Sequence, residues 1–155
     1  MGRIEDRLAA LGISLPRPHP PHAPLLPLVV HGGRAQTSGQ LPRLDGRLTS
    51  SGLLGRDLDV TAGRAAARVR GLNALSTLRA GLGDLDRVER VLSVLVFVAC
   101  VPGFTEQPAV ADGASEVLMQ AFGDPAGRHT RSAVGVAALP RGGPVEIEVT
   151  VALLD

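Results

Sequence analysis

The sequence predicts an α+β fold in which two helices cover one face of a mixed β-sheet. Three observations support this class. The predicted elements follow the order strand, strand, helix, strand, helix, strand, strand. A run over residues 91–98 that is apolar except for Ser93 is typical of a strand that is buried on both faces. Apolar residues alternate with acidic or polar ones over residues 145–153, which indicates a strand with one buried face.

The composition is that of one domain without a strongly charged partner. The chain has 155 residues and a formal net charge of +1, so we expect neither a nucleic acid nor an anionic membrane as partner. Lys, Tyr and Trp are absent, which leaves no Tyr or Lys to act as acid, base or Schiff-base nucleophile. The single Cys100 excludes an internal disulfide. A charged start and the lack of a long apolar run lead us to expect a cytoplasmic protein.

The first part of the chain is predicted to be an extension followed by an extended arm. Ile4 and Leu8 among charged residues predict a short helix, so we divide the chain into a helical extension over 1–14 and a single domain over 15–155. Prolines dominate residues 16–27, which excludes a helix and indicates a polyproline-like strap on the domain surface.

Two strands, a loop and two helices are predicted in the middle of the chain. The strands, 28–30 and 34–38, flank a glycine pair, and a long loop follows over 41–59. The first helix covers 62–82, with Thr61 as its N-cap and Gly83 at its end.

The second helix, over 109–122, follows the Pro-Gly pair at 102–103 that ends the apolar strand.

The last third of the chain is predicted to form an antiparallel hairpin. Two β-rich runs, 127–140 and 145–151, flank a turn of prolines and glycines. Arg131 shares one face of the first run with three small residues, Ala133, Gly135 and Ala137. Two interpretations remain open: Arg131 is a solvated residue at a strand end, or the small residues leave room for a ligand or another chain.

With both helices on one face, the other face of the sheet needs a cover. We expect this open face to carry Arg131, Glu146 and Glu148, because the two acids alternate with the apolar residues of the last strand. Copies of the same chain in a cyclic homo-oligomer would cover it.

The sequence holds no pattern typical of a metal or cofactor site. Its four histidines stand at unrelated spacings: His19, His22, His31 and His129. On a strand, His129 points the same way as Arg131, and histidine suits proton transfer near neutral pH. The three Phe residues are the only aromatic ones, which argues against binding of single-stranded nucleic acid.

A set of short motifs runs along nearly the whole chain from about residue 15. They are Ser-Gly-Gln-Leu-Pro at 38–42, Gly-Asp-Leu-Asp at 83–86, Gly-Phe-Thr-Glu-Gln-Pro at 103–108, Gly-Ala-Ser at 113–115, Arg-Ser-Ala-Val-Gly-Val at 131–136, Leu-Pro at 139–140 and Val-Glu-Ile-Glu at 145–148. These motifs closely resemble the reactive intermediate deaminase family, also called the YjgF family. The sequence is most similar to the branch with the signature Gly-Arg-His-x-Arg-Ser-Ala-Val-Gly-Val.

The resemblance implies a chorismate-mutase-like α+β fold, a homotrimer and three clefts between subunits. It implies that 2-imino acids are hydrolysed to 2-keto acids and ammonia, with no cofactor. Arg131 then binds the substrate carboxylate, for which a planar guanidinium is suited, and Glu146 orients a water. The remaining substrate-binding residues that the resemblance implies are Ser38, Gly39, Ala133 and His129.

The predicted hairpin tests this arrangement. If Leu139 pairs with Val145, Arg131 lies on the order of 20 Å from Glu146, so only neighbouring chains could bring both to one small ligand.

Three positions depart from the archetype of the family. Leu25 stands in place of a tyrosine, Ala133 in place of a cysteine, and Gly113 in place of an asparagine of the second helix. Two functions therefore remain open: a deaminase of small imines or enamines, and a non-catalytic trimeric binder of small carboxylates. A ribonuclease is disfavoured, because the sequence lacks an aromatic or basic groove.

Overall fold

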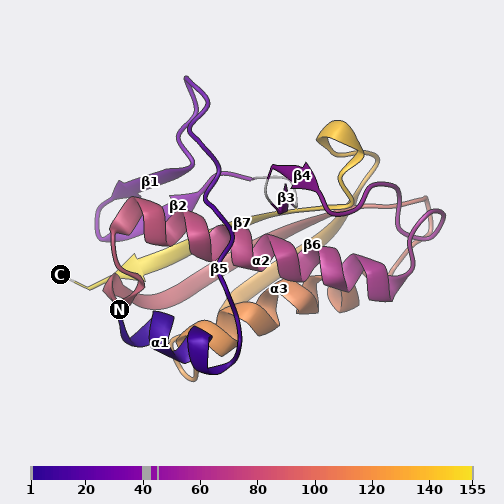
Figure 1. Ribbon diagram of the computed structural model, residues 1–155. Coiled ribbons are helices and arrows are strands. Elements are labelled where there is room, and N and C mark those ends of the chain that lie inside the picture. The colour runs from indigo at the N-terminus through magenta and orange to yellow at the C-terminus, as the bar shows by residue number, and fades with distance from the viewer. Residues whose placement is uncertain (1, 40–42, 45, 155) are drawn as a thin grey trace.

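A computed structural model describes residues 2–39, 43–44 and 46–154 (Figure 1). The helices are α1 (Arg3–Ala10), α2 (Val60–Leu82) and α3 (Gln107–Phe122), with short 3-10 turns at Leu85–Arg87 and Pro140–Gly142. The strands are β1 (Leu28–His31), β2 (Arg34–Thr37), β3 (Arg43–Leu44), β4 (Arg47–Leu48), β5 (Val88–Ala99), β6 (Thr130–Val136) and β7 (Val145–Leu153). Part of one family motif lies outside the described residues, namely Gln40, Leu41 and Pro42. The last two also belong to the predicted long loop.

The main sheet has five strands in the order β1-β2-β7-β5-β6. β6 runs parallel to β5, and the other neighbours are antiparallel, so the sheet is mixed. Helices α2 and α3 lie side by side on one face of it (Figure 1). The predicted α+β class, with two helices on one face of a mixed sheet, is confirmed.

The predicted hairpin is wrong, because β6 and β7 are not neighbours. β5 lies between them and pairs with both. The apolar β5 is buried most fully when a strand lies along each of its edges, and the eight residues over 137–144 easily span the roughly 10 Å between alternate strands. A Pro/Gly turn signal does not distinguish a hairpin from a connection that passes one strand.

The core lies between the sheet and the helices. On β7 the residues from Val145 to Leu153 alternate between buried and half-buried, as their pattern predicts. α2 begins at Val60 and its N-cap is Asp59, whose carboxylate accepts the Ala62 N–H at 2.8 Å, so the predicted Thr61 cap is wrong. Asp competes well for this position because its carboxylate also faces the positive end of the helix dipole.

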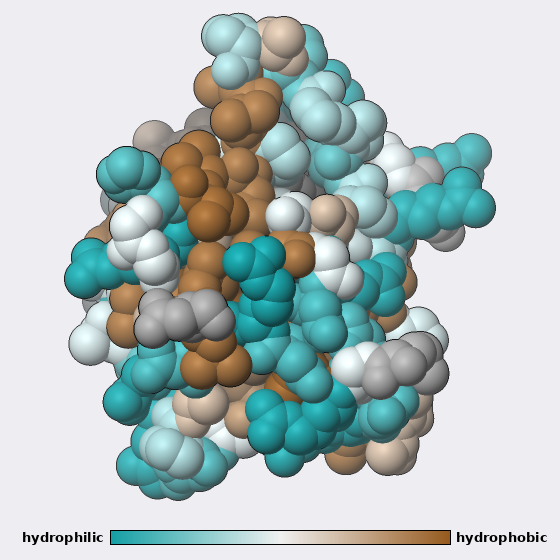
Figure 2. Space-filling model, turned by 90° about the vertical axis from the view of Figure 1, so that its left-hand side faces the viewer, coloured by the Kyte–Doolittle hydropathy of each residue, from teal (hydrophilic) through white to brown (hydrophobic). Residues whose placement is uncertain are grey.

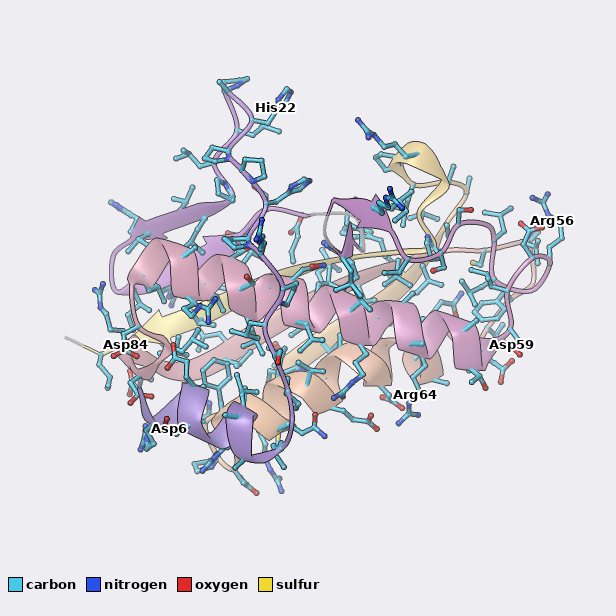
Figure 3. All side chains as sticks on the ribbon, viewed as in Figure 1. Asp6, His22, Arg56, Asp59, Arg64 and Asp84 are labelled. Atoms are coloured by element: carbon cyan, nitrogen blue, oxygen red, sulfur yellow. The ribbon has the colours of Figure 1, made fainter. Side chains whose placement is uncertain are left out.

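The N-terminal helix α1 packs against this core through Ile4 and Leu8, both buried. Asp86 accepts hydrogen bonds from the backbone N–H groups of Arg3 and Ile4 and so caps the helix. The proline-rich arm that follows projects from the sheet, with His22 near its tip (Figure 3). None of the helices in the described part of the chain is both long and apolar enough to span a membrane.

Candidate functional site

Arg131 lies on the helix side of the sheet. It pairs in register with Val94 of β5, which is buried beneath the helices, so the side chain points toward α3. The prediction that Arg131 shares the open face with Glu146 and Glu148 is therefore wrong. Strand pairing alone does not show which face of a strand is covered, because that depends on the element that packs against the sheet.

The guanidinium of Arg131 is held at one end by α3. Its Nη1 donates to Asp112 Oδ1 at 2.9 Å and to Ser115 Oγ at 3.1 Å, and its Nη2 donates to the Pro108 carbonyl at 3.3 Å. A guanidinium has five N–H donors. Nε–H and one Nη2–H have no acceptor among the described residues, and the side chain is 22% exposed. These two donors can bind an incoming carboxylate.

His129 reaches the same serine. Its Nε2 lies 2.9 Å from Ser115 Oγ, and its Nδ1 lies 2.7 Å from the Gly127 carbonyl oxygen. A carbonyl only accepts, so Nδ1 carries the hydrogen, and in the neutral ring Nε2 accepts from the Ser115 hydroxyl. His129 and Arg131 therefore converge on Ser115, consistent with the prediction that they point the same way.

Sequence reasoning missed Asp112 and Ser115. They stand three residues apart and so share one face of α3. No local signal places that face against β6, because the contact depends on how two separate elements pack, with partners 14 to 19 residues apart. The resemblance places the family asparagine at Gly113, but a Cβ there would meet the Arg64 backbone of α2. Gly113 thus faces the other helix, and Asp112 is the residue beside Arg131.

Asp112 changes the charge of this site. Its carboxylate neutralises Arg131 at close range, and it is half exposed. An anionic ligand therefore gains less Coulomb energy here than at an arginine beside a neutral amide.

We expect Asp112→Asn to bind pyruvate about fivefold more tightly, because one repelling charge is removed near the ligand. Isothermal titration calorimetry at low salt measures the change. Asp124→Asn is the matched control, since Asp124 pairs with Arg128 on the exposed surface. Unchanged or weaker binding by Asp112→Asn would contradict the role assigned to this carboxylate.

Glu146 lies in a different place, at a pocket of about 240 Å³ beneath the proline-rich arm. Ser38, Gly39 and Leu25 also line this pocket. A Cβ at Gly39 would meet the Glu146 carboxylate, so only glycine leaves that group undisturbed. The three predicted residues Ser38, Gly39 and Glu146 are thus brought together, next to an exposed leucine.

A buried arginine, Arg70, also interacts electrostatically with Glu146. Arg70 of α2 is only 2% exposed, and burial lowers its pKa to about 9, while the negative charge of Glu146 opposes that shift. No pattern in the sequence singles out Arg70, which lies in a helix rich in arginine and alanine. Any change of Glu146 therefore needs a check of stability as well as of activity.

Arg131 and Glu146 do not meet within one chain. Arg131 pairs with Val94 and Glu146 with Phe97, on opposite edges of β5, so their Cα atoms lie roughly 14 Å apart by strand geometry. Their side chains also leave opposite faces of the sheet. The Cα separation is shorter than the distance on the order of 20 Å that the predicted hairpin implies, and that hairpin does not exist. Ala133 lies on the Arg131 side and is half-buried.

The described residues include one group of carboxylates close enough to share a cation. Ligand atoms of Glu5, Asp84 and Asp86 lie within 4.8 Å of one another. Asp86 already caps α1. This group lies where α1 meets the 3-10 turn Leu85–Arg87, and it shares no residue with the sites of Arg131 or Glu146.

Apolar side chains are exposed beside the Glu146 pocket and along the edge strand β1. They include Leu25, Leu26, Val29 and Val30. Figure 2, viewed from the side of β1, shows apolar atoms gathered in a band on this surface.

Comparisons with known proteins agree with this architecture. Residues 5–144 match the sequence model of a family described as YjgF/chorismate mutase-like, a description that also carries the term endoribonuclease. Protein TCP17 of Trypanosoma cruzi is 47% identical over 152 residues, which cover 98% of this chain and 95% of that protein.

Two solved structures are similar throughout. Atu1372 of Agrobacterium tumefaciens, of unknown function, is 40% identical with a TM-score of 0.87, over 97% of this chain and 91% of that one. A Shewanella oneidensis protein, provisionally termed an endoribonuclease, is 32% identical with a TM-score of 0.92, over 98% of this chain and 100% of that one.

Proposed function

The chain belongs to the YjgF/chorismate mutase-like family, and on this premise we propose that it hydrolyses small reactive 2-imino acids to 2-keto acids and ammonia. The reaction takes place in clefts shared by neighbouring chains of a homotrimer. The observation that carries the proposal is the state of Arg131, whose Nη1 is fixed by α3 while two other N–H donors remain for a carboxylate.

Arg131, held by Asp112 and Ser115, forms a carboxylate clamp that orients the substrate. Asp112 and Ser115 fix the plane of the guanidinium, so little side-chain entropy remains to be lost when the ligand binds. A carboxylate held by two parallel hydrogen bonds places its neighbouring C=N carbon at a defined point. The iminium carbon is already electrophilic, so positioning supplies most of the rate.

A second chain supplies Glu146, which holds the attacking water. Within one chain Glu146 and Arg131 lie on opposite faces of the sheet, so neighbouring copies must contribute one each. β6 is an edge strand of the main sheet, and its residues are half-buried or exposed, which leaves it accessible to another copy. A ring of identical interfaces gives three equivalent clefts.

The alternative is a trimeric binder of small carboxylates without turnover. Leu25 favours it, because 62% of this apolar residue is exposed at the pocket of Glu146, where the family archetype has a tyrosine. Loss of a hydroxyl there and of a thiol at Ala133 removes polar groups that could assist catalysis.

We expect the protein to accelerate the loss of imino acids that an amino-acid oxidase generates in situ, and Arg131→Ala to reduce this acceleration at least about 100-fold. Arg128→Ala is the matched control, since this arginine is exposed and pairs only with Asp124 among the described residues. The disappearance of imine and the release of ammonia measure the reaction.

The outcomes separate the two functions. A wild-type protein that binds pyruvate through Arg131 but accelerates no imine in the series is a binder. Full acceleration by Arg131→Ala would refute the assigned site.

A further inference from the structure

The hydroxyl of Ser115 lies between a base and a cation. His129 Nε2 accepts its hydrogen at 2.9 Å, and Arg131 Nη1 donates to its oxygen at 3.1 Å. Removal of the proton toward His129 leaves negative charge on an oxygen that already faces a guanidinium. Both contacts therefore favour the ionised form of this hydroxyl, and the Asp112 carboxylate on the same Nη1 offsets part of the effect of the guanidinium.

The third member of the arrangement orients the base. The Gly127 carbonyl accepts from His129 Nδ1 at 2.7 Å, which fixes both the tautomer and the plane of the ring. A hydroxyl, a base within hydrogen-bond reach and a group that orients the base are the parts of an activated nucleophile. Ser115 and His129 are both half-buried, so a small molecule can reach them.

We propose that Ser115 and His129 form a proton-transfer pair with an activated serine hydroxyl, placed beside the carboxylate clamp of Arg131. Within the proposed function, on which this part rests, the pair moves the protons of imine hydrolysis. Glu146 orients the water, and the pair takes and returns its proton.

In the addition step the pair acts as the base that takes a proton from water. The water oxygen forms a bond to the iminium carbon, and the π electrons of C=N move to nitrogen. One water proton passes to Ser115 Oγ as the proton of Ser115 moves to His129 Nε2. The product is a neutral carbinolamine beside a protonated His129.

Elimination reverses the relay. The proton returns through Ser115 to the amino nitrogen, the C–N bond breaks, and its electron pair leaves with ammonia. The O–H electron pair of the carbinol forms the C=O bond, and its proton leaves with ammonia as ammonium. Iminium and water thus become keto acid and ammonium.

A purely structural role for the two residues makes a different prediction. If the two residues only hold Arg131 in position, any side chain at residue 129 that keeps the hydrogen bond to Ser115 will preserve the rate of imine hydrolysis. His129→Gln distinguishes the two roles, because the amide still forms hydrogen bonds but does not take a proton.

The first experiment does not depend on imine chemistry. Diisopropyl fluorophosphate forms a P–O bond with an activated serine, fluoride leaves, and the serine proton goes to the base. Peptide mass spectrometry should find Ser115 modified at least about tenfold faster than Ser132, an exposed serine next to Arg131. In His129→Gln the rate at Ser115 should fall to that of Ser132. Equal rates at the two serines in the wild type would overturn the proposal.

The second experiment separates proton transfer from binding. His129→Gln should reduce imine hydrolysis by roughly 100-fold while the dissociation constant for pyruvate changes less than about twofold. Ser115→Ala should reduce hydrolysis as much and also weaken pyruvate binding, because it removes one of the two side chains that fix Arg131. Circular dichroism and urea denaturation check that both variants fold. Full turnover by His129→Gln would overturn the relay. Rapid labelling of Ser115 in a wild type without imine turnover would support the pair and reject only the deaminase.

Discussion

Mixing Arg131→Ala chains with Glu146→Gln chains should restore about one quarter of the wild-type imine hydrolysis, although each variant alone is nearly inactive. In the proposed trimer each cleft takes Arg131 from one chain and Glu146 from its neighbour, so a mixed trimer contains one cleft in which both residues are intact. Random assembly of equal amounts places both in about one cleft in four. The residues lie on opposite faces of each sheet, which makes this result specific for a site between chains.

The variants can be co-expressed with different affinity tags, so that mixed assemblies are isolated before the rate is measured. In isolated mixed trimers one cleft in three has both residues intact, so the rate there should be about one third of the wild type. A mixture of two preparations of Arg131→Ala alone is the control. Absence of recovery in verified mixed assemblies would show that the two residues do not share a cleft. Unfolding of Glu146→Gln in urea must be measured in parallel, because the charge of Glu146 supports the buried cation of Arg70.

Gly113→Ala should lower the free energy of unfolding by about 3 kcal/mol. A Cβ at this position meets the Arg64 carbonyl oxygen, and it would lie 3.0 Å from the Arg64 carbonyl carbon and 3.1 Å from the Arg68 nitrogen. All three atoms belong to the backbone of α2, so no side-chain rotation relieves the contact. The two helices must separate, and Asp112 and Ser115 move with α3.

Gly81→Ala is the matched control within α2. The nearest atoms to a Cβ there belong to the side chain of Leu28, which can rotate away. Ala also favours a helix over Gly by up to about 1 kcal/mol, so the change should stay within about 1 kcal/mol of the wild type. Urea denaturation compares the two variants. A Gly113→Ala protein as stable as Gly81→Ala would show that the helices are not in close contact at Gly113.

The sequence identifies many residues of the candidate site, but it does not predict which of them lie together. Ser38, Gly39 and Glu146 share one pocket, as the resemblance implies. Arg131 and His129 converge on Ser115, which no local pattern indicates. Helix α3 fixes the orientation of the arginine, and its contact with β6 depends on how these two consecutive elements pack on the sheet.

The sequence alone determined the class of the fold, the approximate positions of the helices and of the main-sheet strands, and which residues of a strand share a face. These properties depend on local periodicity: two residues for a strand and 3.6 for a helix. The short strands β3 and β4 lie in the stretch that was predicted to be a loop. The tertiary structure decided that β5 separates β6 from β7, that Arg131 faces α3, and that Asp112 and not Gly113 stands beside it. Strand partners and the covered face depend on hydrogen bonds and packing between distant segments, and periodicity carries no information about which distant segment will be the neighbour.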